Sequence, residues 1–215
     1  MEQDAIVRRL GAMFTSTLSN ALEDIGEDGV ISGLTPAGPA MRCAGRAMCV
    51  LETTGPAGTF PAEAFKVGEM IDAARPGDVV VVANGGQPVS SWGGTASFAA
   101  KQKGIAGLIV DGGVRDREEM IEHAFPVFTR HMVPTTGRTR IQVVEIGGTI
   151  EVSGIRVVTG DVIVADGTGI VCIPKDKAGE VADIAEALQA DDDQAVAEIA
   201  KGLTFTEAMA KFRKI

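Results

Sequence analysis

The chain contains 215 residues, of which 29 are acidic and 20 are basic, so its formal net charge at neutral pH is −9. Hydrophobic residues make up 45% of the chain and aromatic residues only 4%. This length and apolar content suit one compact domain with a real core and exclude intrinsic disorder. Because a phosphate backbone would be repelled by the negative charge and no basic cluster offsets it, we expect no nucleic-acid partner.

The same sequence disfavours membranes and structural metal sites built on cysteine. No apolar run approaches the roughly 18 residues of a membrane helix, and the acidic start Met1-Glu2-Gln3-Asp4 lacks the basic residues of a signal peptide. Cys43, Cys49 and Cys172 cannot all pair within the chain and form no metal-binding motif. We expect buried thiols, no membrane association and a cytoplasmic location.

The first half alternates helical and strand patterns. Helices are predicted over residues 6–14, 18–22, 62–74 and 92–103 and from Arg117 onward, strands over 46–53, 78–83 and 107–110, and a long surface connection over 28–45. Asp111-Gly112-Gly113 is predicted as a turn after the last of these strands. Strands that alternate with helices indicate α/β packing.

The second half is dominated by short strands and ends in helices. Strands are predicted over residues 141–146, 149–152, 155–158, 162–165 and 169–173, separated by glycine-containing turns. An amphipathic helix is predicted over 178–190, followed by a solvated loop at Asp191-Asp192-Asp193. A last helix begins at Thr204, with a Thr204–Glu207 capping box and with Phe205, Met209 and Phe212 facing inward.

Arg115-Asp116 is the most informative pair of residues for function. It follows a buried strand and precedes a helix, and α/β proteins place ligands at such strand ends. Arginine binds carboxylates in a bidentate manner, and aspartate is a ligand for Mg²⁺. A structural alternative is that Asp116 and Glu119 cap the following helix, while Arg115 pairs with a surface carboxylate.

The helix start after Trp92 supplies a second candidate element. Its first turn, Gly93-Gly94-Thr95-Ala96, offers free backbone N–H groups that can bind a carboxylate, and glycine lets a ligand approach closely. The alternative is an ordinary helix start capped by Ser90 or Ser91.

Two motifs are specific in combination. The first is Trp92-Gly-Gly, followed by Ala-x-x-x-Gly104-x-x-Gly107-x-x-x-Asp111-Gly-x-x-Arg115-Asp116, and the second is Gly160-Asp161-x-x-x-Ala165-Asp166-x-x-Gly169-Ile-x-x-x-Pro174. Together they resemble the RraA-like family, which includes class II 4-hydroxy-4-methyl-2-oxoglutarate and 4-carboxy-4-hydroxy-2-oxoadipate aldolases that also decarboxylate oxaloacetate. The resemblance covers most of the chain, from the helix around Thr17–Leu22 to Pro174.

The resemblance implies a three-layer α/β/β fold akin to swivelling domains. It implies one domain over residues 1–215 with a helical C-terminal tail from residue 174, and homotrimers or homohexamers with sites between subunits. By position, a pyruvyl carboxylate would be bound by backbone donors of Gly93, Gly94, Thr95 and Ala96 and by Arg115, and Mg²⁺ or Mn²⁺ by Asp116. Arg115 and the metal would stabilise the pyruvate enolate shared by aldol cleavage and decarboxylation.

One departure from the family pattern concerns the acidic residue that the aldolases carry 21 positions before the arginine. In this chain that position is Gly94, and Ala96 stands where the family has a leucine two positions later. This predicts that binding of pyruvate or oxaloacetate is favoured over efficient aldolase turnover. The aldolases also use a glutamate from a neighbouring subunit, for which Asp192, Asp193 and Glu198 are candidates.

Two hypotheses of different classes follow. The leading one is a divalent-metal-dependent lyase that cleaves or decarboxylates a 2-oxo acid to yield pyruvate. The alternative is a non-catalytic regulatory protein, because the family also contains ribonuclease E inhibitors that act by protein contact. A methyltransferase is disfavoured because no glycine-rich cofactor loop follows an early strand.

Overall fold

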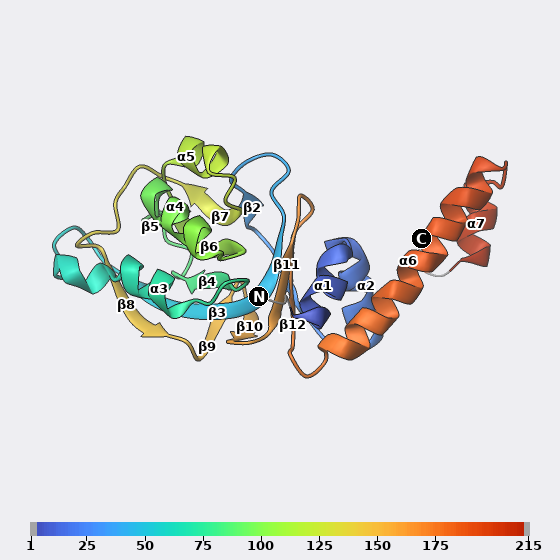
Figure 1. Cartoon of the computed structure of the whole chain (residues 1–215), viewed down its shortest axis with the longest axis horizontal. Coiled ribbons are helices and arrows are strands. Elements are labelled where there is room, and N and C mark those ends of the chain that lie inside the picture. The colour runs from blue at the N-terminus through green and yellow to red at the C-terminus, as the bar shows by residue number, and fades with distance from the viewer. Residues whose placement is uncertain (1–3, 213–215) are drawn as a thin grey trace.

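The computed structural model describes residues 4–212 and has a mixed α/β architecture (Figure 1), as predicted. Residues 1–3, most of the acidic start considered above, lie outside the described residues. The helices are α1 (Ala5–Ala12), α2 (Thr15–Asp24), the 3₁₀ helix η1 (Ala62–Phe65), α3 (Val67–Ala73), α4 (Gly94–Lys103), α5 (Arg117–Glu122), α6 (Ala178–Ala200) and α7 (Phe205–Lys211). None of the helices in the described range is both long and apolar enough to cross a membrane.

The strands form one large mixed sheet and a separate hairpin. The strands are β1 (Val30–Ile31), β2 (Thr35–Pro36), β3 (Cys43–Thr54), β4 (Val79–Ala83), β5 (Ser90–Trp92), β6 (Gly107–Val114), β7 (Val127–Met132), β8 (Ile141–Ile146), β9 (Thr149–Val152), β10 (Ile155–Val158), β11 (Val162–Ala165) and β12 (Ile170–Ile173). The sheet order is β1-β12-β11-β3-β4-β6-β7-β2, with β5 on β6 and β8 on β3, while β9 pairs with β10. The central strands β3, β4, β6 and β7 are parallel, as is β5 beside β6.

Burial on both faces explains why β4 and β6 are nearly continuous apolar runs. Every residue of both strands is buried, which is typical of parallel strands covered on both sides. Figure 1 shows α3, α4 and α5 along one side of these strands, with β8, β9 and β10 on the other. Helix α4 ends at Gly104, whose φ of 83° is the left-handed conformation that favours glycine at a helix end.

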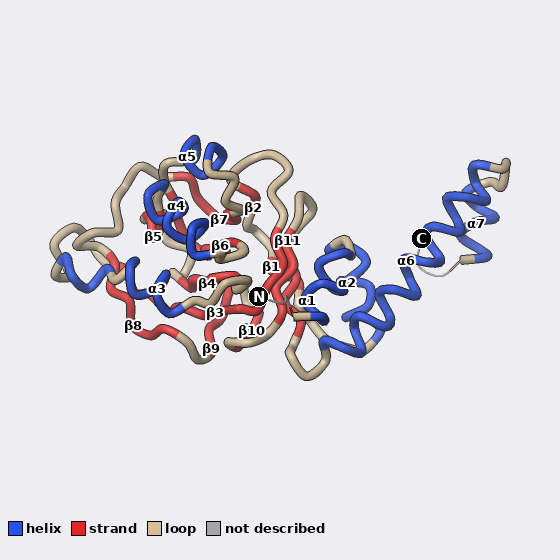
Figure 2. Tube along the Cα trace, viewed as in Figure 1, coloured by secondary structure: helices blue, strands red, loops and turns tan. Residues whose placement is uncertain are grey.

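A second hydrophobic core lies on the far side of β11 and β12. There α1, α2 and the first half of α6 pack around Leu10, Leu18, Leu22 and Val181, all fully or nearly fully buried. The rest of α6 and α7 extend away from the body as an arm, and Figure 2 shows the helices as two groups separated by strands. The three cysteines are free and buried, as predicted, and burial raises the pKa of the Cys49 thiol to about 11.

Several predicted boundaries were wrong in the first half. The connection over 28–45 contains β1 and β2 and the start of β3, because its short segments pair with β12 and β7. The helix over 62–74 is two helices, broken at Lys66 with φ of 27°. Trp92 belongs to β5, so α4 begins only at Gly94.

The predicted turn Asp111-Gly112-Gly113 is wrong, because β6 continues through it to Val114. The glycine at 112 serves packing within the sheet: a Cβ there would lie 2.7 Å from Cβ of Asn84. Strand β7 was not predicted.

The C-terminal helices also differ from expectation. Helix α6 continues through Asp191–Asp193 to Ala200, with Asp191 and Asp192 partly exposed, and Gln189 Nε2 donates to Asp193 Oδ1 one turn along the helix at 3.1 Å. The Thr204–Glu207 capping box is confirmed. Phe205 and Met209 do not face inward in the single chain, where they are 60% and 58% exposed. Phe212 is partly buried.

Candidate functional site

The predicted site elements meet because two parallel strands end side by side. Trp92 of β5 pairs with Val114 of β6, and the N–H of Arg115 donates to the carbonyl of Trp92 at 3.0 Å. The residues that follow each strand are therefore neighbours: Gly93 leads into α4, and Asp116 leads into α5. The structure thus brings together the two segments that the sequence analysis singled out.

Asp116 is held toward the start of α4 and away from its own helix. Its backbone is left-handed, with φ of 60° and ψ of 48°, a conformation that aspartate tolerates better than most residues. Its Oδ2 accepts a hydrogen bond from the Gly94 N–H at 3.1 Å and lies 3.5 Å from Arg115 Nε. Asp116 makes no side-chain cap on α5, so the capping alternative is wrong.

The two glycines at the start of α4 leave room for carboxylates from α5. A Cβ at Gly93 would lie 2.6 Å from Oδ2 of Asp116. A Cβ at Gly94 would overlap Oε2 of Glu119 and lie 2.6 Å from Cβ of Glu119. A side chain at position 93 would therefore displace the Asp116 carboxylate, and no larger residue fits at position 94 unless α5 moves.

These segments line one cavity of about 230 Å³. Its lining residues are Phe65, Val67, Ser90, Ser91, Trp92, Gly93, Thr95, Ala96, Arg115 and Asp116. The Arg115 and Asp116 side chains are 44% and 37% exposed, so both remain accessible to a ligand. The first N–H groups of a helix have no acceptor within it, which leaves those of Thr95 and Ala96 facing this end of α4, whereas the Gly94 N–H already donates to Asp116.

Phe65 and Val67 are lining residues that sequence reasoning missed. They lie on either side of the break between η1 and α3, and no local sequence pattern indicated that this segment reaches the cavity. Ser90 and Ser91 do not cap α4, since both are buried in β5. The apolar wall of the cavity is Trp92, whose ring stacks on Phe125 with centroids 6.5 Å apart.

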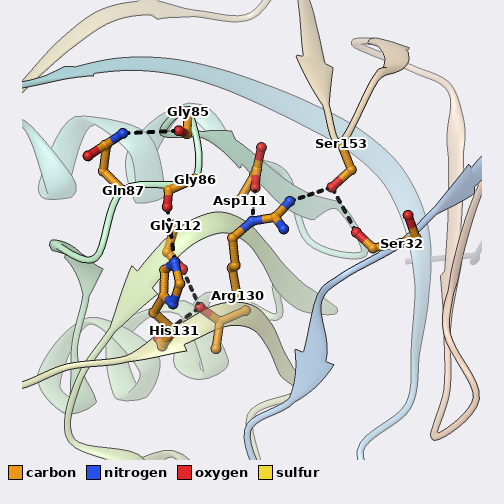
Figure 3. A network of polar contacts seen from close by, with 10 residues as sticks. Ser32, Gly85, Gly86, Gln87, Asp111, Gly112, Arg130, His131 and Ser153 are labelled. Carbon is orange, nitrogen blue, oxygen red and sulfur yellow. Dashed lines mark hydrogen bonds and ion pairs between the residues drawn. The ribbon is translucent and has the colours of Figure 1, made fainter.

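A partly buried ion pair joins the strands that lead to the site. Arg130 of β7 donates through Nε to Asp111 of β6 at 2.7 Å and through Nη2 to Ser153 at 2.7 Å (Figure 3). Ser153 in turn donates to the carbonyl of Ser32 at 2.8 Å. Asp111 is four residues before Arg115, so this network lies on the strand that leads to the Arg115-Asp116 pair.

A second polar cluster, missed at the sequence level, lies directly behind the cavity. Ser91 Oγ is 2.5 Å from Glu52 Oε2, and Asn84 Nδ2 donates to Glu52 Oε2 at 3.0 Å and to Ser91 Oγ at 2.8 Å. Burial raises the pKa of Glu52 to about 7, although the hydrogen bonds from Ser91 and Asn84 act in the opposite direction. The only sequence signal was Glu52 itself, the single acidic residue of β3.

Comparison with known proteins identifies the family of this chain. Residues 15–172 match the RraA-like family model, described as Aldolase/RraA. The chain belongs to the RraA-like family. The predicted RraA-type fold is thereby confirmed.

The relatives include proteins named as aldolases and others without an assigned role. A putative 4-hydroxy-4-methyl-2-oxoglutarate aldolase of Halalkalibacterium halodurans is 34% identical over 121 residues, 56% of this chain and 57% of that protein. An uncharacterized protein of Methanocaldococcus jannaschii is 39% identical over 101 residues, 47% of this chain and 48% of that protein. The matched regions thus span only about half the length of these curated relatives.

Solved structures agree over nearly the whole chain. An uncharacterized protein from Pseudomonas syringae pv. tomato superposes with a TM-score of 0.87 at 28% identity, covering 98% of this chain and 96% of its own. Streptomyces coelicolor RraAS2, described as an unusual member of the RNase ES inhibitor RraA protein family, gives 0.76 at 24% identity over 94% and 100% of the two chains. At that identity the second match supports the fold alone.

A side chain of α5 occupies the space beside Gly94, the position at which the resemblance to the aldolases implies an acidic residue. The Glu119 side chain fills the volume where a side chain on residue 94 would begin. Asp192, Asp193 and Glu198 lie on α6 and do not line the cavity of their own chain. Glu198 forms ion pairs there with Lys201 and Lys211.

Mg²⁺ fits the chemistry of the cavity through Asp116. Among residues 4–212, no group of three or more His, Cys, Asp or Glu side chains is arranged to hold a metal. Mg²⁺ does not require such a group, since it keeps several waters and takes one or two protein carboxylates. The accessible Asp116 carboxylate, beside the Arg115 guanidinium, meets that requirement.

Proposed function

We propose that this RraA-like protein is a divalent-metal-dependent lyase that acts on a 2-oxo acid and releases pyruvate. The observation that supports the proposal is the placement of Arg115 and Asp116 against the start of α4, within one cavity of about 230 Å³. Relatives named as 4-hydroxy-4-methyl-2-oxoglutarate aldolases support the same reaction class.

In this proposal, the chain itself binds and orients the pyruvyl end of the substrate. The N–H groups of Thr95 and Ala96 and the Arg115 guanidinium hold the carboxylate, using unsatisfied helix donors and a fixed positive charge. Asp116 would hold Mg²⁺ or Mn²⁺, which when bound polarises a 2-keto oxygen as a Lewis acid. Arg115 also lies where negative charge develops as the enolate forms.

Cleavage of either substrate gives the same enolate. In oxaloacetate, the bond between C3 and the C4 carboxylate breaks and its electron pair remains on C3 as CO₂ leaves. In a 4-hydroxy-4-methyl-2-oxoglutarate-type aldol, the C4 hydroxyl loses its proton to solvent, the C3–C4 bond breaks with its electron pair remaining on C3, and C4 leaves as a carbonyl. Both paths then require a proton at C3, so one site can perform both reactions.

The test is pyruvate formation from oxaloacetate with added Mg²⁺, against an EDTA control and the uncatalysed metal background. We expect metal-dependent activity above that background, and an Arg115→Ala variant about 100-fold slower or more, as for loss of one charge-stabilising donor. Arg138→Ala is the matched control, because Arg138 is exposed and does not line the cavity. Full activity in the Arg115→Ala variant would overturn the assigned role.

The exposed arm favours a second proposal, in which copies of the chain assemble as a homotrimer or homohexamer. Val196, Phe205 and Met209 are 67%, 60% and 58% exposed on α6 and α7. In such an assembly, Asp192, Asp193 or Glu198 of a neighbouring copy would complete the site. A non-catalytic regulator that binds another protein through this arm is the competing function, and its binding would not respond to a chelator.

A further inference from the structure

The buried cluster of Glu52, Asn84 and Ser91 connects the site cavity with a second hollow in the surface. Ser91 lines the cavity that holds Arg115 and Asp116. Glu52 and Asn84 line a different hollow of about 370 Å³, together with Glu151 of β9. Since Ser91 and Glu52 are in direct contact at 2.5 Å, one hydrogen-bonded path crosses the sheet from one hollow to the other.

When Glu52 is a carboxylate, the cluster has fewer hydrogen-bond donors than its buried acceptors need. Within the described part of the chain, Glu52 Oε1 and Asn84 Oδ1 are buried acceptors with no hydrogen-bond partner. Leaving buried acceptors unpaired is unfavourable, because they lose their hydrogen bonds to water without gaining others. A proton on Glu52 changes the carboxylate from a pure acceptor into a donor, which relieves part of this cost.

Protonation of Glu52 changes which hydrogen bonds the Ser91 hydroxyl can make. Both hydrogens of the Asn84 amide are engaged, one with Glu52 Oε2 and one with Ser91 Oγ. When Glu52 is protonated and donates to Ser91 Oγ, that oxygen accepts two hydrogen bonds, and its own hydrogen no longer points to Glu52 Oε2. The hydrogen can then turn to the unpaired Asn84 Oδ1 or to a substrate in the cavity that Ser91 lines.

We propose that Ser91 delivers the proton that converts the enolate into pyruvate, and that Glu52 reprotonates Ser91. This inference rests on the lyase function proposed above. As the C3–H bond forms, the Ser91 O–H bond breaks and the Glu52 proton moves to Ser91 Oγ. Glu52 is left as a carboxylate and regains a proton from water in the outer hollow, so the net change is enolate plus one proton to pyruvate.

The surroundings of Glu52 are suited to this exchange near neutral pH. Burial is the main cause of its raised pKa, and the groups that oppose it are Ser91 and Asn84. Of the ionisable side chains on neighbouring strands, Glu151 of β9 lines the outer hollow, and the Glu145 carboxylate of β8 lies against Gly148. Glu52 therefore changes protonation in the range where the proposed reaction would operate.

The experiment compares cleavage with proton transfer in wild type, Glu52→Gln and Ser91→Ala. Cleavage is followed as CO₂ release from oxaloacetate with Mg²⁺, and proton transfer as methyl hydrogen–deuterium exchange of pyruvate in D₂O by NMR. We expect exchange to fall about 100-fold in both variants, the usual size of a general acid–base contribution, and to fall by a clearly larger factor than CO₂ release does. Glu151→Gln is the matched control, since it alters the other carboxylate of the outer hollow.

The pH profile and a direct titration separate the relay from a merely structural role. Exchange draws a proton from pyruvate into the cluster and needs the Glu52 carboxylate, so the wild-type rate should rise through about pH 7, and Glu52→Gln should lose this limb. Equal losses of cleavage and exchange, or exchange preserved in Glu52→Gln, would overturn the relay. Thermal unfolding of each variant shows whether it is folded.

A measurement that needs neither substrate nor metal distinguishes failure of the relay from failure of the lyase. The Glu52 carboxyl is titrated by ¹³C NMR in the wild type, with Glu52→Gln to assign the signal. Titration near pH 7 in a protein without metal-dependent lyase activity would refute the proposed function while preserving the cluster's chemistry. Titration close to the ordinary glutamate value of about 4.3 would overturn the relay even in an active enzyme.

Discussion

Gly94 gives the sharpest test of how the site is packed. A Cβ added at this position would overlap the Glu119 carboxylate and lie 2.6 Å from Glu119 Cβ. The end of a glutamate can rotate away, but its Cβ is fixed to α5, so Gly94→Ala forces the two helices apart. Overpacking of this kind costs about 1–3 kcal/mol in the free energy of unfolding.

The size of this effect should depend on Glu119. In a Glu119→Gly background, the three nearest atoms that a Cβ at position 94 would meet are gone. Alanine is otherwise favoured over glycine in a helix by about 1 kcal/mol, so Gly94→Ala should then be neutral or stabilising. The double-mutant cycle therefore predicts an interaction energy of about 2 kcal/mol that favours the double variant.

Urea unfolding followed by the fluorescence of Trp92 measures the cycle. This residue is the only tryptophan, it is 1% exposed, and it precedes the α4 start by two positions, so its signal reports on this region. If Gly94→Ala costs the same with and without the Glu119 side chain, the carboxylate does not occupy this volume. The explanation of the glycine would then be refuted.

Three further predictions follow from other contacts. Arg130→Ala should destabilise the protein by about 3 kcal/mol, because it leaves the buried Asp111 carboxylate unpaired, as chemical denaturation would show. As the pH rises from about 4.5 to 7, the wild type should lose up to about 3 kcal/mol in the free energy of unfolding, because the raised pKa of Glu52 stabilises the folded state only while Glu52 is protonated. Glu52→Gln should not show this loss when unfolding is measured as a function of pH. Replacing Phe205 and Met209 by serine should lower the oligomeric state measured by light scattering, if the arm joins copies of the chain.

The parts of the fold that the sequence predicted are those with local causes. The buried run of β4 and the Thr204 capping box depend on residues that are adjacent or one helical turn apart. The errors arose where distant partners decide the outcome. Gly112 lies in a sequence that is typical of a turn, yet it is part of β6. The glycine is explained by a distant residue, since a Cβ at this position would meet the Asn84 side chain.

The same division applies to the candidate site. Arg115 and Asp116 are adjacent in sequence at a strand end, and so were found as a pair. Phe65 and Val67 reach the cavity only through the break between η1 and α3, which no local pattern indicated. The roles proposed for Arg115 and Asp116 remain predictions until the oxaloacetate assay is performed.

One packing constraint explains both the Glu119 side chain and the glycine at position 94, where the resemblance to the aldolases implies an acid. Helix α5 approaches the start of α4 closely enough for Asp116 to accept from the Gly94 N–H, and that approach leaves no room for a side chain on residue 94. An acidic residue there would require α5 to lie farther away, which would also weaken the Asp116 contact. The glycine therefore belongs with the close packing of α5, and restoring an acid by Gly94→Asp should not restore a family-type site unless Glu119 is shortened as well.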